Sequence, residues 1–72
     1  MSVRQAVQLT VNGKPRELAA PTTIEGFLKS MGIDSRFIAV AYNGEVLRKE
    51  DFPRIVLKSG DSLEIVRPVG GG

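Results

Sequence analysis

Residues 21–32 read PTTIEGFLKSMG, and this segment decides the predicted fold because it carries a clear helical period. Its apolar side chains recur at the i, i+3, i+4 and i+7 positions that form one stripe on an α-helix; they are Ile24, Phe27, Leu28 and Met31. A helix with one apolar stripe packs that face on another layer of structure. The sequence therefore predicts a single amphipathic helix lying against a sheet.

The ends of this helix are marked by residues with capping preferences. Thr22 is the predicted N-cap, and Glu25, three residues later, completes a capping box. Gly32 can end the helix in the left-handed conformation. Gly26 lies inside the helix at a cost of about 1 kcal/mol relative to alanine, which suggests a close approach to a strand.

The residues before the helix predict a β-hairpin. Apolar and polar residues alternate between Ala6 and Val11, the two-residue period of a half-buried strand. Asn12-Gly13 follows, and this dipeptide favours a tight turn because both residues tolerate positive φ. A second strand is expected from about Arg16 to Ala19.

The residues after the helix predict three more strands. Phe37 to Tyr42 is a continuous apolar run, as expected for a strand that is central or covered on both faces. A second Asn-Gly turn, at residues 43 and 44, leads into a short strand over residues 45–47. After an irregular connection, residues 55–57 return to the core, and the last strand runs from Ser62 to about Arg67 with Leu63 and Ile65 facing one way.

The resulting order is two strands, a helix and three strands, in which the helix is the crossover between the first hairpin and the later strands. This order predicts an α+β domain of the β-grasp, or ubiquitin-like, type, with a mixed sheet of about five strands and one main helix. The predicted domain covers residues 1–67. Residues 68–72 form a predicted flexible tail that ends in Gly-Gly.

The composition excludes most catalytic machinery. The 72 residues contain no cysteine and no histidine, so thiol nucleophiles, imidazole bases and the usual metal ligands other than carboxylates are missing. The carboxylates form no calcium-loop pattern, and we expect no metal site. With a net charge of +2, no apolar run long enough to span a bilayer and no signal-like N-terminus, we expect a cytoplasmic protein.

The C-terminal glycines are the candidate functional residues. Residues beyond Arg67 read PVGGG, and five extended residues reach about 16 to 18 Å. Glycine has no Cβ, so Gly70, Gly71 and Gly72 are suited to thread a narrow channel in a partner and present a carboxylate there. The alternative is that these glycines are a frayed terminus or part of a cloned linker.

A carboxylate needs activation before it reacts, most simply as an acyl-adenylate made from ATP. The chain has no phosphate-binding loop and no dinucleotide fingerprint, so we expect it to bind no cofactor itself. ATP and Mg²⁺ would then belong to an activating partner enzyme.

Three features together resemble the ThiS family, the sulfur carrier proteins of thiamine biosynthesis. They are Asn-Gly-Glu-Val at residues 43–46, Gly-Asp-Ser-Leu-Glu-Ile-Val at residues 60–66, and the terminal Gly-Gly. The resemblance implies that Gly72 is adenylated by a ubiquitin-activating-like adenylyltransferase and converted to a thiocarboxylate, with Gly71 as its required neighbour. It also implies that a sulfur donor such as a cysteine desulfurase supplies the sulfur and that thiazole synthase receives it.

Other functions remain open from the sequence. Sister carriers share the fold and tail: the small subunit of molybdopterin synthase, carriers for cysteine synthesis or tRNA thiolation, and ubiquitin-like modifiers. A β-grasp module that binds RNA or protein is a second alternative, but the basic residues are spread out and few aromatic residues accompany them, so no nucleic-acid partner is expected. An enzyme is not expected, since Glu50-Asp51, the adjacent carboxylate pair, lies beside basic residues in a predicted loop.

The predicted docking surface for a partner is the sheet face that the helix leaves uncovered. Tyr42 and Val66 are the predicted interface residues on this face. The alternative is that both side chains pack under loops.

Overall fold

A computed structural model describes residues 6–67 of the chain. One mixed sheet contains five strands in the order β2-β1-β5-β3-β4; they are β1 (Val7–Val11), β2 (Lys14–Leu18), β3 (Ala39–Tyr42), β4 (Glu45–Val46) and β5 (Ser62–Val66). The pairing of β1 with β5 is parallel, and the other three pairings are antiparallel. The predicted mixed sheet with one main helix is confirmed.

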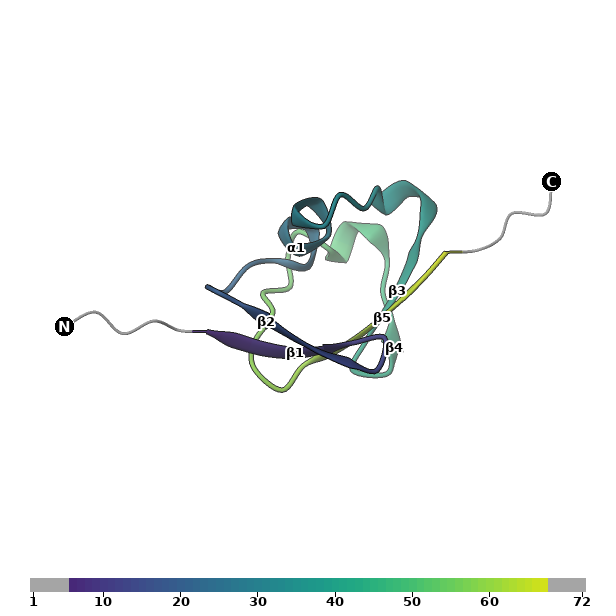
Figure 1. The fold of residues 1–72 in the computed structure, drawn as a ribbon. Helices are drawn as coiled ribbons and strands as arrows, with labels where there is room; N and C mark the ends of the chain where they lie inside the picture. Colours follow the sequence, from purple (N-terminus) through teal and green to yellow (C-terminus); the bar gives the residue numbers. More distant parts are fainter. Residues whose placement is uncertain (1–5, 68–72) are drawn as a thin grey trace.

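The domain has two layers (Figure 1). The helix α1 (Ile24–Ser30) and two short 3₁₀ helices (Ser35–Phe37 and Lys49–Asp51) lie on one side of the twisted sheet. The core between the layers consists of buried apolar side chains from the helix, the strands and the connections before β3 and β5; they are Val7, Leu9, Ile24, Phe27, Leu28, Ile38, Val40, Phe52, Leu57 and Leu63. Over residues 6–67, no helix is both long enough and apolar enough to cross a membrane.

The helix begins one residue later than predicted. Thr23, not Thr22, is the N-cap, and its side chain accepts a hydrogen bond from the Gly26 amide at 3.0 Å. The predicted capping box is also wrong, because the Glu25 carboxylate pairs with Lys29 one turn later, at 3.8 Å.

Tertiary contacts fix this start of the helix. The amide of Ile24 donates to the Ile55 carbonyl at 3.0 Å, and the amide of Glu25 donates to the Phe52 carbonyl at 3.1 Å. Helix N-terminal amides have no partner within the helix, so the connection between β4 and β5 supplies the acceptors that α1 lacks. A hydrogen bond from the Leu57 amide to the Thr22 carbonyl also joins this connection to the residues just before the helix.

The helix ends as predicted, at a glycine in the left-handed conformation. Gly32 has φ +72°, its amide donates to Lys29, and the next amide, of Ile33, donates to Leu28. These two bonds make a Schellman motif. The expected reason for Gly26 is wrong in detail, because a Cβ there would meet the side chain of Thr22 and not a strand.

The predicted strand over residues 37–42 begins later and lies elsewhere in the sheet. Phe37 ends a 3₁₀ helix and is 66% exposed, so the strand starts at Ala39. The 3₁₀ helix forms because the Asp34 carboxylate caps it, accepting from the Arg36 amide at 3.0 Å. The central strand is β5, and β3 lies beside it with only its Val40 face buried.

Replacing Thr23 with alanine should lower the free energy of unfolding by about 1 kcal/mol, because the Gly26 amide loses its acceptor. Thr22→Ala is the matched control, since this side chain is not the cap, and it should cost less than half as much. Urea denaturation followed by circular dichroism measures both. Equal losses in the two variants, or a larger loss for Thr22→Ala, would contradict the assignment of the cap.

Candidate functional site

The predicted tail residues Gly70, Gly71 and Gly72 lie outside the described residues. The described structure that leads to them is β5, which ends at Val66 and is followed by Arg67. The candidate site is therefore built from the residues that hold β5 and from the surfaces beside it.

The two neighbours of β5 hold it unequally. On one side β3 pairs with it at four positions, from Ala39↔Val66 to Tyr42↔Leu63. On the other side β1 pairs with it at only two, Thr10↔Ser62 and Val11↔Leu63. Both ends of β5 consequently depend on side chains for part of their hydrogen bonding.

Asp61 anchors the start of β5. Its side chain is buried, with 4% of the residue exposed. One carboxylate oxygen, Oδ2, accepts from the Tyr42 hydroxyl at 2.8 Å and from the Lys58 amide at 2.9 Å, and Oδ1 accepts from the Asn43 side chain at 3.2 Å. The Lys58 ammonium lies 3.6 Å from Oδ1. This cluster joins the turn after β3 to the turn before β5.

The cluster holds Asp61 in its charged form. Burial acts to raise the pKa of Asp61, but the hydrogen bonds from Lys58, Tyr42 and Asn43, together with the Lys58 charge, outweigh it and place this pKa below its ordinary value. The hydrogen bond to the Tyr42 hydroxyl and the charge of Asp61 raise the pKa of Lys58. Both groups are therefore charged near neutral pH, and in this ion pair only the carboxylate is buried, because the Lys58 side chain is 74% exposed.

Asn12 contacts the other end of β5. Its side-chain oxygen accepts from the Ile65 amide at 2.7 Å, and its side-chain nitrogen donates to the Ile65 carbonyl at 3.2 Å. Asn12 itself lies in the β1–β2 turn, just beyond the last residue of β1.

The two predicted interface residues lie on opposite faces of the sheet. Val66 is on the uncovered face and is 55% exposed, as expected. The placement of Tyr42 on that face is wrong: Tyr42 pairs with the fully buried Leu63, packs against the core and is hydrogen-bonded to Asp61. Strand partners share a face, so Tyr42 points toward the helix layer.

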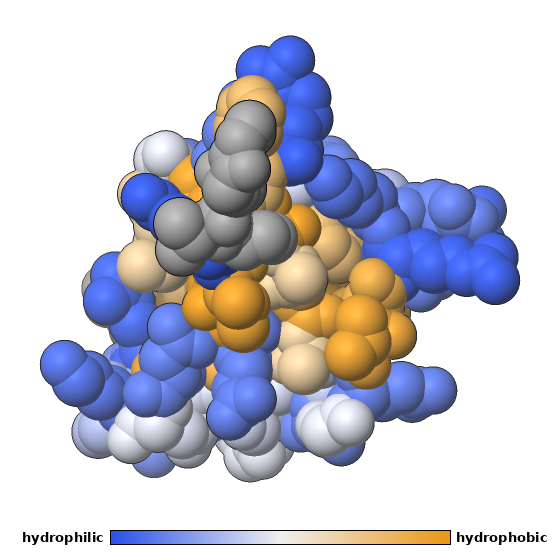
Figure 2. Space-filling model, turned by 90° about the vertical axis from the view of Figure 1, so that its right-hand side faces the viewer, coloured by the Kyte–Doolittle hydropathy of each residue, from blue (hydrophilic) through white to orange (hydrophobic). Residues whose placement is uncertain are grey.

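Val66 lies in an apolar patch on the uncovered face, with the exposed Glu64, opposite Ala41, beside it. Register brings together Ala39 opposite Val66 and Ala41 opposite Val46, and Val46 is 75% exposed. We call Ala39, Ala41, Val46 and Val66 the valine-alanine patch. Figure 2 views the side on which β3, β4 and the end of β5 lie, and apolar surface gathers at its centre with hydrophilic surface around it. This patch adjoins the point where the chain leaves β5.

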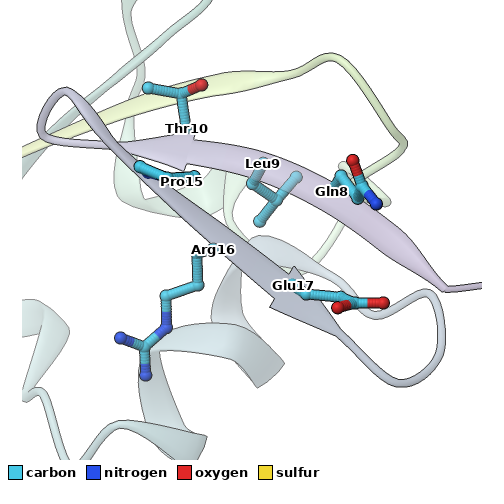
Figure 3. A pocket seen from close by; sticks show the side chains of 6 residues that line it. All are labelled: Gln8, Leu9, Thr10, Pro15, Arg16 and Glu17. Atoms are coloured by element: carbon cyan, nitrogen blue, oxygen red, sulfur yellow. The ribbon is translucent and has the colours of Figure 1, made fainter.

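A surface hollow of about 470 Å³ lies along the β1–β2 hairpin. Its lining comes from both faces of the ribbon: Leu9 and Arg16 are strand partners on one face, whereas Gln8 and Thr10 point the other way (Figure 3). Side chains that point apart cannot converge on a ligand. The hollow therefore follows the free edge of β2 and is not a binding pocket.

Comparison with known proteins identifies the family. A family model described as "ThiS family" matches residues 9–72. The chain belongs to the ThiS family. The family prediction from residues 43–46, residues 60–66 and the terminal glycines is confirmed. Two matching proteins, from Bacillus subtilis and Thermus thermophilus, are named sulfur carrier protein ThiS, which agrees with the carrier class predicted for this chain.

A solved structure confirms the β-grasp fold. The crystal structure of the thiamine biosynthesis protein ThiS from Geobacter metallireducens matches with a TM-score of 0.80 and 35% sequence identity, and the match covers 92% of this chain and 100% of that chain.

Two kinds of curated relative match nearly the whole chain. The sulfur carrier protein ThiS of Bacillus subtilis is 35% identical over 65 residues, which are 89% of this chain and 98% of the relative. The thiazole synthase of Paramagnetospirillum magneticum is 39% identical over 66 residues, which are 92% of this chain but 20% of the relative. The chain thus spans about a fifth of the length of this thiazole synthase, and the same share of the one from Magnetococcus marinus.

Sequence reasoning missed the roles of Asp61, Asn12 and Asn43 in holding β5. It assigned the two asparagines to turns through their backbone conformation, which the structure bears out with φ values of +52° and +49°. The sequence signal for their contact with β5 is faint: each Asn-Gly turn directly follows a strand next to β5, and a short carboxamide reaches the central strand from there.

Asp61→Asn should lower the free energy of unfolding at neutral pH by about 2 kcal/mol, because an amide of the same shape cannot accept all of these bonds. Since the folded-state pKa of Asp61 lies below its ordinary value of 3.8, the carboxylate stabilises the fold fully above that value, and this contribution is lost as the pH falls toward the folded-state pKa. Stability measured by urea denaturation at decreasing pH should therefore fall less steeply in the variant.

Asp34→Asn is the control for this experiment. Hydrogen bonds from Arg36 lower the pKa of Asp34 to about 2, but its side chain is 43% exposed. Salt screens the exposed Asp34–Arg36 ion pair more than it weakens the hydrogen bonds that the buried Asp61 carboxylate accepts. The stabilisation by Asp61 should therefore persist at high salt. This prediction is wrong if, at high salt, the free energy of unfolding falls equally steeply with decreasing pH in the wild type and in Asp61→Asn.

Proposed function

We propose that this chain is a sulfur carrier of thiamine biosynthesis that carries sulfur as a thiocarboxylate on Gly72. The observation that carries the proposal is the family match over residues 9–72, which extends through the terminal glycines. The names of two relatives support this function over that of the sister carriers: sulfur carrier protein ThiS in Bacillus subtilis and thiamine biosynthesis protein (ThiS) in Geobacter metallireducens.

The proposed chemistry takes place in two steps at the Gly72 carboxylate. A carboxylate oxygen attacks the α-phosphorus of ATP and pyrophosphate leaves, which gives an acyl-adenylate. A hydrosulfide ion, released when a thiol of a partner reduces the donor's persulfide and is itself oxidised to a disulfide, then attacks the carbonyl carbon, and AMP leaves with one of the original carboxylate oxygens. The product is the thiocarboxylate, whose sulfur is the group that is transferred.

The chain supplies the carboxylate and its presentation, and partners supply the rest. It has no histidine or cysteine to act as base or nucleophile. We therefore assign ATP and Mg²⁺ to a ubiquitin-activating-like adenylyltransferase, and the sulfur to a donor such as a cysteine desulfurase. These steps would take place in the cytoplasm.

Thiazole synthase is the proposed acceptor of the sulfur. Two thiazole synthases contain a segment that is 39% and 33% identical to this chain over 66 residues each. A carrier-like segment within a longer thiazole synthase supports a working association between the two kinds of domain.

The valine-alanine patch is the proposed docking surface for the activating enzyme. It is apolar and exposed, and it adjoins the end of β5, so a partner seated on it would be close to the residues that follow Arg67. The interface role predicted for Tyr42 is not part of this surface, since its side chain faces the helix layer and contacts Asp61.

Intact mass measurement tests the chemistry directly. The protein is expressed beside its activating enzyme, a cysteine desulfurase and thiazole synthase, and its C-terminal peptide is fragmented. We expect sulfur in place of one carboxylate oxygen on Gly72 and no change in a variant lacking residues 71 and 72. An unmodified terminus with all partners, ATP and sulfur donor present would instead favour a plain binding module.

Val66→Asp should weaken binding to the activating enzyme at least tenfold, roughly the effect of placing a charge in the apolar centre of an interface. Val56→Asp is a matched control, because Val56 is 54% exposed against 55% for Val66 but pairs with Thr23 at the start of the helix. Calorimetric titration measures both affinities, and circular dichroism checks that each variant is folded. Unchanged affinity in Val66→Asp would remove the patch from the interface.

A further inference from the structure

The two asparagines of the Asn-Gly turns contact the same strand from opposite flanks. Asn12 follows β1, and Asn43 follows β3, and both have positive φ, +52° and +49°. The side chain of each makes hydrogen bonds to the backbone of β5. They act at different ends, because Asn43 bonds to Ser62 and Asn12 to Ile65.

Asn12 takes the place of a strand residue that β1 does not have. The last backbone bond on this flank runs from the Asn12 amide to the Leu63 carbonyl at 2.8 Å, where β1 has already ended. The next amide and carbonyl of β5 that face this flank belong to Ile65. The Asn12 carboxamide satisfies both, accepting at 2.7 Å and donating at 3.2 Å, as the backbone of a longer β1 would.

Ile65 is the last residue of β5 that is held on this flank within the described structure. Beyond it, Val66 has a strand partner only on the other flank, where it pairs with Ala39. Without the Asn12 carboxamide, the segment from Glu64 to Val66 would be held by β3 alone. It could then pivot about its β3 pairing.

We propose that Asn12 is a positioning residue that fixes where the chain leaves the sheet on its way to Gly72. The consequence of this contact, the delivery of Gly72 to the activating enzyme, rests on the proposed function. The contact between Asn12 and Ile65 does not depend on that function. Displacing a reacting group by about 1 Å can slow a reaction by up to a hundredfold, so the exit point of β5 is a place where a single hydrogen-bonded side chain affects a rate.

Asn12→Gly is the most direct test, because glycine adopts the same positive φ and the change removes only the carboxamide. Native-state hydrogen exchange followed by NMR should show the Ile65 amide exchanging about tenfold faster, the expected effect of losing its acceptor. The exchange rate of the Ser62 amide should not change relative to that of the core amide of Phe27. In the matched variant Asn43→Gly the pattern should reverse, with Ser62 affected and Ile65 not.

If the exchange rates of the Ile65 and Phe27 amides rise by the same factor in Asn12→Gly, the variant is destabilised globally. That result would overturn the proposal. Asn12→Asp gives a further check. It keeps the oxygen that accepts from the Ile65 amide but replaces the donor to the Ile65 carbonyl with a second oxygen, so this amide should regain part of its protection.

The delivery role is tested with the activating enzyme, ATP and Mg²⁺, by measuring pyrophosphate release. Asn12→Gly should lower kcat about tenfold and leave KM within about twofold, because three of the four patch residues lie on β3 and β4 and Val66 keeps its pairing with Ala39, while the orientation of the reacting group changes. Thr22→Ala, which changes no side-chain contact of β5, should keep the wild-type kcat once corrected for the folded fraction, and Asn12→Asp should recover part of the loss.

The two parts of the experiment fail separately. No pyrophosphate release from the wild type would overturn the proposed function and with it the delivery role, while hydrogen exchange would still decide whether Asn12 holds Ile65. Wild-type activity with an unchanged kcat in Asn12→Gly would overturn the delivery role alone.

Discussion

The parallel pairing of β1 with β5 is the constraint on which the rest of the domain depends. It places the last strand of the described chain at the centre of the sheet, beside the first strand. Parallel neighbours cannot be joined by a tight turn, so the chain between them must leave the sheet and return. Helix α1 makes this crossing, the β1–β2 hairpin fills one flank, and β3 with β4 fills the other. The connection before β5 then satisfies the amides at the start of the helix.

A central strand with short neighbours has backbone groups left to satisfy, and polar side chains do this here. Burying Asp61 costs free energy that only a full set of donors offsets. Tyr42, Asn43 and the Lys58 amide and ammonium provide them. Because these donors come from the turn after β3 and the turn before β5, the buried charge fixes their relative position. Apolar contacts alone would leave this register less specific.

The sequence predicted features that depend on local chemistry. Both Asn-Gly turns, the stripe from Ile24 to Met31 and the left-handed Gly32 are local, and they sufficed for the order of elements and the β-grasp fold. What it missed was decided by distant contacts. From the sequence, Glu25 favours Thr22 as the cap, whereas acceptors on Phe52 and Ile55 place the start of the helix after Thr23.

The same division applies to the candidate site. Val66 was placed correctly on the uncovered face because strand alternation is local, whereas Tyr42 was misplaced because its face depends on pairing with Leu63. The proposed role of Gly72 came from the resemblance to a family and not from the physics of the described domain. The contact of Asn12 with Ile65 joins residues 53 positions apart, and no local pattern specifies such a pair.

A carrier without catalytic groups can influence its reaction through where it docks and how it aims its terminus. In this domain the surface proposed for docking and the contact proposed for aiming lie on opposite flanks of β5. The valine-alanine patch is on the β3–β4 flank, and the Asn12 carboxamide is on the β1 flank. A substitution in the patch can therefore change the affinity for the partner without changing the orientation of the terminus, and a substitution of Asn12 can change the orientation without changing the affinity. Because β5 is central, both flanks act on the same strand, and the backbone of Ile65 and Val66 is where their effects meet.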